Sequence, residues 1–149
     1  MPTVIKSERI DLSSEKKTEE FASKFLKKIK PGCSIFLYGE IGVGKTTFIR
    51  YLINKFQKIN KLEITEITSP TFNLLNEYQI NEFKINHYDL FRLKSVEETK
   101  NLNLFDDSKN TINLIEWPQM VKEKPKNLIE LVFEYGKDHK TRFVQIKGL

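Results

Sequence analysis

The sequence predicts an α/β fold in which helices flank a mixed, mostly parallel central sheet. A short apolar segment at Ser34–Tyr38 leads through a glycine-rich loop into a segment with the apolar period of a helix. Further apolar segments of strand length recur up to the end of the chain. The chain has 149 residues, 39% hydrophobic and 30% charged, which favours a single globular domain spanning residues 1–149.

The first part of the chain alternates between strand and helix signals. Loose alternation over residues 3–12 predicts a short strand, and Ser13 or Ser14 can cap the helix that follows. Residues 31–32, a Pro-Gly pair, end that helix. A second helix is expected over residues 45–56, and residues 57–67 are expected to form a loop. The apolar face of the first helix consists of Phe21, Phe25, Leu26 and Ile29, and that of the second consists of Phe48, Ile49, Leu52, Ile53 and Phe56.

The second part of the chain is richer in strand signals. The turn at Asn81 and Glu82 separates the first two of these strands, and residues 136–140 separate the last two as a hairpin. A short helix is expected over residues 95–101. The expected strands cover residues 72–80, 83–89, 112–116, 128–135 and 141–147.

The glycine-rich loop fits the phosphate-loop pattern G-x-x-x-x-G-K-[ST] in full over residues 39–46. Such a loop turns its backbone N–H groups around a phosphate, which requires dihedral angles that glycine adopts at low cost. The following helix directs its N-terminal dipole at the same anion. Lys45 is expected on the β- and γ-phosphates, Thr46 on a magnesium ion and Thr47 on the α-phosphate of ATP or a close relative. The expected nucleotide-binding residues of the loop are Gly39, Glu40, Ile41, Gly42, Val43, Gly44, Lys45, Thr46 and Thr47.

Two acids end predicted strands and are candidates for the metal-directed carboxylate that hydrolysis requires. Asp89 ends one strand and Glu116 ends another. The strand before Glu116 is the more apolar, which favours a buried central position. Ligands of open α/β sheets collect at the carboxyl ends of strands, so both acids can face one site. For each acid alone, a surface carboxylate at a strand end remains an alternative.

Three other side chains lie close to these acids in the sequence. A packed or capping role is favoured for His87 over catalysis, and a packing role for Trp117 over stacking on a base. Arg92 is the one arginine that this interpretation places within range of phosphate, although a structural salt bridge is an equal alternative.

Charge gives a weaker signal about partners. Lys and Arg number 25 against 20 Asp and Glu, a net charge of +5. The most one-sided stretch could attract an anion at low salt, but a solvated helix face is favoured because most of the cations are lysines. That stretch contains Arg50, Lys55, Lys58 and Lys61.

The sequence also favours the cytoplasm. Cys33 is the single cysteine and cannot form an internal disulfide, which indicates a reducing compartment. The N-terminus has no signal pattern, and no apolar run approaches the roughly 20 residues that span a bilayer. No membrane association is expected.

Four segments, taken in order, resemble the TsaE (YjeE) family of bacterial ATPases. They are the loop at residues 39–48, Ser-Pro-Thr-Phe at 69–72, His-Tyr-Asp-Leu-Phe-Arg-Leu at 87–93 and Ile-Glu-Trp-Pro at 115–118. The phosphate loop alone is shared with many proteins, whereas the other segments at these distances are specific. The resemblance covers nearly the whole chain and implies the P-loop NTPase fold.

The resemblance also implies roles for particular residues. Residues 69–71 correspond to a switch-like loop near the γ-phosphate, which adds Thr71 to the nucleotide-binding residues. Asp89 corresponds to the Walker B acid, and Glu116 to a magnesium-site and catalytic carboxylate. The implied catalytic residues are Lys45, Asp89 and Glu116, and the implied magnesium ligands are Thr46, Glu116 and Asp89.

Members of this family are required to make N6-threonylcarbamoyladenosine (t6A) in tRNA. The resemblance implies a weak ATPase that works with the TsaB–TsaD complex, in which TsaD transfers the threonylcarbamoyl group, and implies that contact with tRNA is indirect. The sequence departs from the family pattern at Glu40, where Asp is usual, at Val43, where Ala is usual, and at Phe91, where Tyr is frequent. Val43 is expected to narrow the loop slightly.

Two other functions remain open from the sequence. The first is a small P-loop kinase, but such kinases usually carry an arginine-rich lid, and after the helix that contains Arg50 only Arg92 is expected to serve one. The second is a nucleotide-sensing interaction module with little turnover, in which a partner supplies the missing catalytic groups.

Overall fold

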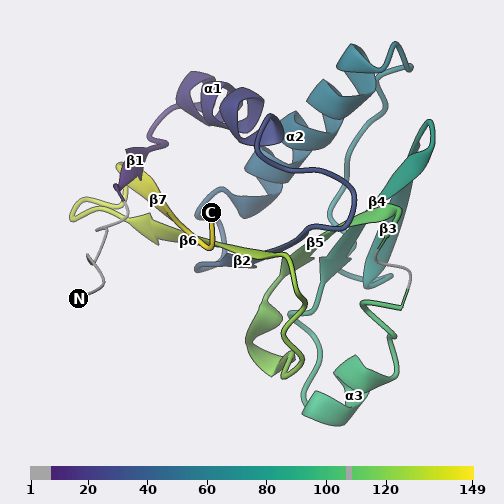
Figure 1. Cartoon of the computed structure of the whole chain (residues 1–149). Coiled ribbons are helices and arrows are strands. Elements are labelled where there is room, and N and C mark those ends of the chain that lie inside the picture. Colours follow the sequence, from purple (N-terminus) through teal and green to yellow (C-terminus); the bar gives the residue numbers. More distant parts are fainter. Residues whose placement is uncertain (1–7, 107–108) are drawn as a thin grey trace, which may run out of the picture.

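The structure is a computed structural model, and it describes residues 8–106 and 109–149. Its strands form a seven-stranded sheet in the order β1-β7-β6-β2-β5-β4-β3 (Figure 1). Strands β6, β2, β5 and β4 pair in parallel, whereas β1, β7 and β3 pair antiparallel at the edges. The predicted α/β fold with a mixed sheet is confirmed. The strands are β1 Ile10–Asp11, β2 Ser34–Tyr38, β3 Leu75–Ile80, β4 Phe83–Asp89, β5 Thr111–Glu116, β6 Leu128–Tyr135 and β7 Arg142–Lys147.

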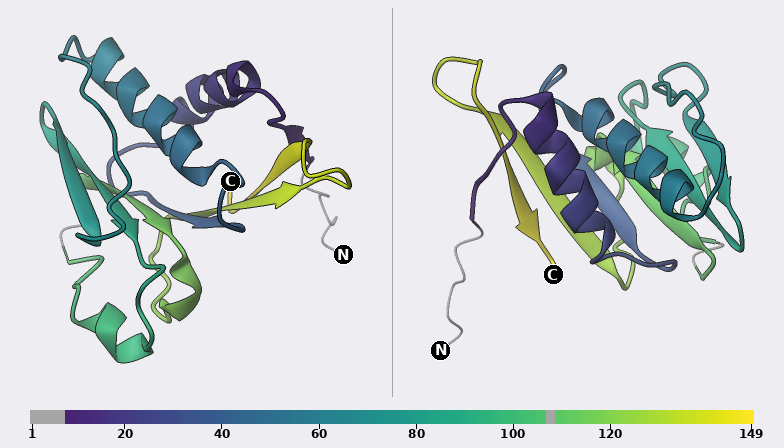
Figure 2. Two further views of the ribbon diagram at one scale, coloured as in Figure 1. Left: turned by 180° about the vertical axis from the view of Figure 1, so that it is seen from behind. Right: turned by 90° about the horizontal axis from the view of Figure 1, so that it is seen from above.

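Helices cover both faces of the sheet. Helices α1 (Glu15–Leu26) and α2 (Lys45–Ile59) lie side by side on one face, as the view from above in Figure 2 shows. Helix α3 (Val96–Lys100) and the 3-10 helix η1 (Pro118–Met120) lie on the other. Ser14 is the cap of α1, because its side chain accepts a hydrogen bond from Lys17 N at 3.2 Å. None of the helices formed by the described residues is long and apolar enough to cross a membrane.

The central strands are buried on both faces, which explains their continuous apolar segments. Alternate residues of β2 enter different cores, since successive side chains of a strand point to opposite faces. Ile35 and Leu37 pack under α1 and α2, and Phe36 packs with Tyr88 and Ile115 on the other face. This double burial fixes β2 and β5 at the middle of the sheet, with their carboxyl ends side by side.

The predicted boundaries differ from the structure at several ends. Of the strand expected over residues 3–12, Ile10–Asp11 is a strand, and residues 3–7 lie outside the described residues. Ile29 follows the end of α1, although its side chain is buried in the same core. Strand β3 begins at Leu75 instead of residue 72, because Leu74 N donates a hydrogen bond to Pro70 O at 2.7 Å and closes a turn.

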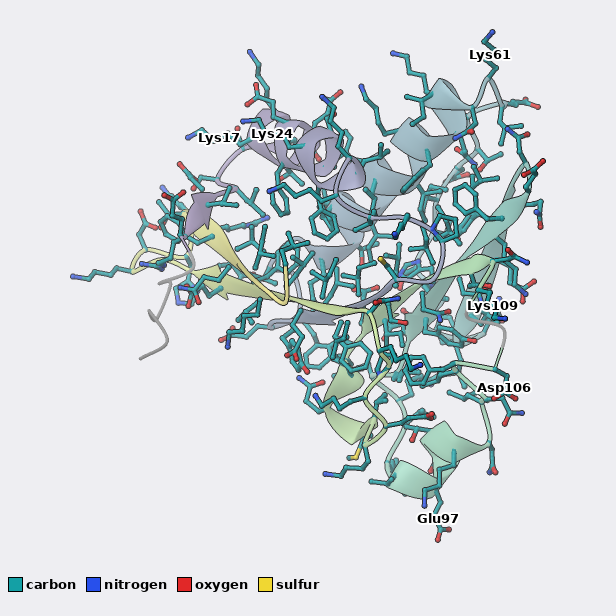
Figure 3. All side chains as sticks on the ribbon, viewed as in Figure 1. Lys17, Lys24, Lys61, Glu97, Asp106 and Lys109 are labelled. Atoms are coloured by element: carbon teal, nitrogen blue, oxygen red, sulfur yellow. The ribbon has the colours of Figure 1, made fainter. Side chains whose placement is uncertain are left out.

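Lysines occur on several elements of the molecule. Figure 3 labels Lys17 and Lys24 close together by α1, Lys61 beyond the end of α2 and Lys109 near β5. In the basic stretch of α2, the Arg50 side chain pairs with Glu15 at 3.4 Å. This arrangement favours a solvated helix surface over a concentrated anion-binding patch.

Candidate nucleotide-binding site

The glycine-rich loop joins the carboxyl end of β2 to the first turn of α2. Gly39, Gly42 and Gly44 have φ angles of 148°, 81° and 114°, which side-chain-bearing residues rarely adopt. A Cβ on Gly39 would also lie 2.8 Å from the backbone oxygen of Phe133. The glycines therefore permit both the curl of the loop and its close approach to β6.

A cavity of about 350 Å³ lies over this loop. It brings together the loop, the Ser-Pro-Thr segment and the carboxyl ends of β4 and β5. Its lining residues are Ile41, Gly42, Gly44, Lys45, Thr46, Thr47, Ser69, Thr71, Asp89, Phe91, Glu116, Trp117 and Arg142. Gly39, Glu40 and Val43 belong to the loop but do not line this cavity. The Val43 side chain is buried in the core.

Lys45 is buried at the floor of the site. Its ammonium group donates a hydrogen bond to Gly39 O and lies 3.7 Å from the centroid of the Trp117 ring. Burial lowers the pKa of Lys45, and the Glu116 and Asp89 carboxylates act in the opposite direction. Among the described residues, no carboxylate lies within 4.0 Å of this ammonium group. It is therefore positioned to pair with a ligand anion.

Glu116 links the phosphate loop to β4. Its Oε1 accepts a hydrogen bond from Thr46 Oγ1 at 3.2 Å, and its Oε2 lies 2.8 Å from His87 Nε2. Glu116 and His87 are 2% and 0% exposed. Within the described part of the chain His87 Nδ1 has no hydrogen-bond partner, which indicates that Nε2 carries the proton and donates it to the carboxylate. His87 is buried, as expected, but its contact with Glu116 was not predicted.

Asp89 is the register partner of Glu116 on the adjacent strand. Its Oδ2 accepts hydrogen bonds from the hydroxyls of Ser69 and Thr71, both at 3.3 Å, and its Oδ1 accepts one from Phe91 N at 3.1 Å. The two hydroxyls are 2.7 Å apart. Asp89 therefore holds the Ser-Pro-Thr segment against the cavity.

The oxygen atoms of three side chains could hold a magnesium ion. They are the Thr46 hydroxyl and the carboxylates of Asp89 and Glu116, which line the same cavity. Magnesium prefers oxygen ligands and is usually bound by one or two carboxylates together with substrate phosphates. The donor set fits that ion.

The arginine prediction needs a correction. The guanidinium of Arg92 lies over the ring of Phe72, 4.9 Å from its centroid, and Arg92 does not line the cavity. Arg142 lines it instead. Arg142 was not expected here, because its position follows from the hairpin. Strand β7 runs antiparallel to β6, so the first residue of β7 lies at the carboxyl edge of the parallel strands.

Trp117 packs beside the site, as expected. Its ring centroid lies 4.8 Å from that of Phe91, and its backbone is left-handed, with φ of 57°. This conformation turns the chain directly after Glu116, and Pro118 then begins η1. Trp117 and Phe91 were not predicted to line the cavity.

These features define the class: an α/β protein with a phosphate loop between a central parallel strand and a helix. Comparison with known families then identifies the particular group. The family model of the threonylcarbamoyl adenosine biosynthesis protein TsaE matches residues 12–144, and the chain belongs to this family.

Individual relatives agree with this assignment. The Rickettsia bellii tRNA threonylcarbamoyladenosine biosynthesis protein TsaE is 42% identical over 130 residues, covering 87% of this chain and 88% of the relative. The protein of the same name from Nostoc sp. is 32% identical over 140 residues, covering 90% and 82%. The crystal structure of the Bacillus protein YdiB, 19% identical, superposes with a TM-score of 0.70 over 99% of this chain and 90% of that one, a likeness of fold.

Trp117 offers a direct optical test of the site, because it is the only tryptophan of the chain. We expect magnesium and ATP together to shift or quench its fluorescence, since phosphate would draw Lys45 away from the indole ring. Chelation of magnesium should reverse most of the change, and Thr46→Ala should weaken it. If an independent assay detects binding while the signal stays constant, the nucleotide does not approach Lys45 and Trp117.

Proposed function

We propose that this protein binds and hydrolyses ATP as an accessory protein for t6A synthesis in tRNA, acting with the TsaB–TsaD complex in the cytoplasm. Membership of the TsaE family supports the pathway. The observation that carries the nucleotide part is the cavity in which the phosphate loop faces Thr46, Asp89 and Glu116. Lysine, hydroxyl and paired carboxylates around such a loop are the groups that phosphoryl transfer to water requires.

The phosphates of ATP would lie along the loop, with Lys45 compensating the charge of the β- and γ-phosphates. A second cavity, of about 170 Å³, adjoins the first and shares Gly44, Thr47 and Arg142 with it. The start of α1 lines this cavity through Ser14, Glu15 and Thr18, among others. We assign the nucleoside end of ATP to it.

The carboxylates have different environments and therefore different roles. Glu116 is held by Thr46 and His87 and lines the cavity, so it can position or deprotonate a water there. Asp89 holds Ser69 and Thr71, which couples the state of that loop to the site. Magnesium, bound by Thr46, Asp89 and Glu116 with the phosphates, would supply charge neutralisation of the developing phosphoryl group.

Exposed apolar side chains support a protein partner at the mouth of the cavity. Ile41 and Phe91 line the cavity and are 68% and 49% exposed, and Phe72, beside Thr71, is 82% exposed. Large apolar side chains grouped at one surface commonly mark a protein contact. A partner that covers this mouth would order the Ser-Pro-Thr segment and exclude water. Contact with tRNA would then occur through the complex.

The alternative functions are weakened in different ways. A kinase of this fold usually carries several arginines in a lid, whereas Arg142 is the one arginine among the described residues that lines the cavity. A sensing module without turnover would need no oriented carboxylate, whereas Glu116 is fixed by two hydrogen bonds.

Phosphate release, measured with and without TsaB and TsaD, tests the proposal. We expect slow release alone and an increase of more than tenfold with both partners, because groups supplied in trans accelerate P-loop hydrolases by roughly 10³–10⁵. Rapid release without partners would contradict partner dependence. No release in any mixture would indicate a sensing module, and transfer to a metabolite in place of water would indicate a kinase.

A substitution at Phe72 tests the proposed partner surface. Phe72→Ser should reduce the stimulation by TsaB and TsaD several-fold while leaving nucleotide binding unchanged. Ile64→Ser is the matched control, since Ile64 is also an exposed apolar residue but, unlike Phe72, is not adjacent in the chain to a residue that lines the cavity. Equal stimulation of both variants would place the partner elsewhere.

A further inference from the structure

We infer that Arg142 binds the α-phosphate of the nucleotide from the β6–β7 hairpin, at the junction of the phosphate and nucleoside cavities. The inference rests on the proposed function, because it requires a nucleotide in the loop. It adds a residue from the opposite end of the chain to a site otherwise built from the P-loop and from strand ends β4 and β5.

The position of Arg142 is the first observation. It is the first residue of β7 and the register partner of Tyr135 on β6. Its Nη1 atom lies 3.9 Å from the place that a Cβ on Gly44 would occupy. The side chain therefore lies against the glycine that precedes Lys45, within range of a ligand on the loop.

The charge of Arg142 is the second observation. Among the described residues, no carboxylate lies within 4.0 Å of its guanidinium, whose central carbon lies 5.7 Å from the centroid of the Tyr135 ring. By contrast, Arg9 pairs with Glu134 at 2.9 Å and Arg50 with Glu15 at 3.4 Å. A half-buried guanidinium beside a phosphate loop, without an acid partner, is suited to a bidentate contact with phosphate.

The backbone of Arg142 is fixed, which gives the side chain a defined origin. Arg142 N donates to Ser13 Oγ at 3.1 Å, and Leu12 N donates to Arg142 O at 2.8 Å. On the partner strand, the Tyr135 hydroxyl donates to Ile41 O at 3.4 Å. The hairpin thus contacts both the segment before α1 and the tip of the phosphate loop.

The lining of the two cavities determines which phosphate Arg142 meets. Lys45, Thr46, Asp89 and Glu116 line only the first cavity, where the γ-phosphate and metal belong. Gly44, Thr47 and Arg142 line both cavities. Arg142 therefore lies on the nucleoside side of the phosphate chain, beside the α-phosphate. It should contribute equally to the binding of ATP and ADP.

Calorimetric titration of Arg142→Gln and Arg142→Lys with ATP and ADP, in the presence of magnesium, tests the inference. We expect Arg142→Gln to weaken both nucleotides by about 10- to 100-fold, the range of a charge-assisted hydrogen bond. Arg142→Lys should restore part of this loss, because it keeps the charge but not the bidentate geometry. Arg9→Gln should bind as the parent does, because Arg9 pairs with Glu134 of the same hairpin and lines neither cavity.

The outcomes of these titrations distinguish the inference about Arg142 from the proposed function. Unchanged affinity of Arg142→Gln, with the parent protein binding normally, overturns the inference and leaves the proposed function standing. A loss confined to ATP places Arg142 at the γ-phosphate and overturns the α-phosphate assignment. Failure of the parent to bind either nucleotide overturns the proposed function itself. Thermal unfolding of each variant shows whether a loss of nucleotide affinity reflects misfolding. If Arg142→Gln is misfolded, the affinity of Arg142→Lys for the nucleotides tests the inference in its place.

Discussion

Lys45→Ala is expected to remove most of the affinity for ATP while the fold stays intact. The ammonium group is buried at the cavity floor, where its recorded partners are Gly39 O and the Trp117 ring. Its loss would leave the phosphate oxygens without their compensating cation, which costs roughly 1.5–3 kcal/mol, or about 10- to 100-fold in affinity. Titration with a fluorescent ATP analogue measures this directly, and circular dichroism reports the fold.

Lys58→Ala is the matched control, since Lys58 lies on the same helix but is exposed and does not line the cavity. It should bind the nucleotide as the parent does. Near-normal binding by Lys45→Ala would contradict the assignment of the loop to phosphate.

Glu116→Gln should reduce turnover in the presence of partners by about 10²–10⁴-fold, the usual contribution of a positioned acid or base. Glutamine keeps the size of the side chain, and its amide can still satisfy both His87 Nε2 and Thr46 Oγ1. The change therefore removes the charge while preserving the buried contacts, and nucleotide binding should change far less than turnover.

Single-turnover phosphate release with TsaB and TsaD present separates chemistry from binding. Glu77→Gln, on the exposed edge strand β3, is the control and should have the turnover of the parent. Turnover of Glu116→Gln within a few-fold of the parent would assign the catalytic role to Asp89 alone.

The fold could be predicted where burial leaves a local pattern. Ser34–Tyr38 and residues 112–116 are continuous apolar segments because β2 and β5 are covered on both faces. The start of β3 was placed too early, since the hydrogen bond from Leu74 N to Pro70 O closes a turn within an otherwise strand-like segment. Such a contact depends on loop geometry that periodicity does not encode.

The candidate site also combines features that a local sequence pattern predicts with features that it does not. The phosphate loop and the acids at the strand ends are local signals, so their placement in one cavity could be anticipated from the sequence. The bond between His87 and Glu116 depends on β4 pairing with β5 in parallel, and the position of Arg142 depends on β6 lying beside β2. Strand order is a property of the whole sheet, which is why these contacts were missed.

Calorimetric titration of the parent protein with ATP, with and without magnesium, tests the central claim most directly. The account predicts one nucleotide bound per chain, with an affinity that falls when magnesium is chelated. Without the ion, the carboxylates of Asp89 and Glu116 would repel the phosphates, and the Thr46 hydroxyl would lose its link to them. Absence of binding, or binding that is indifferent to magnesium, would contradict the site described here.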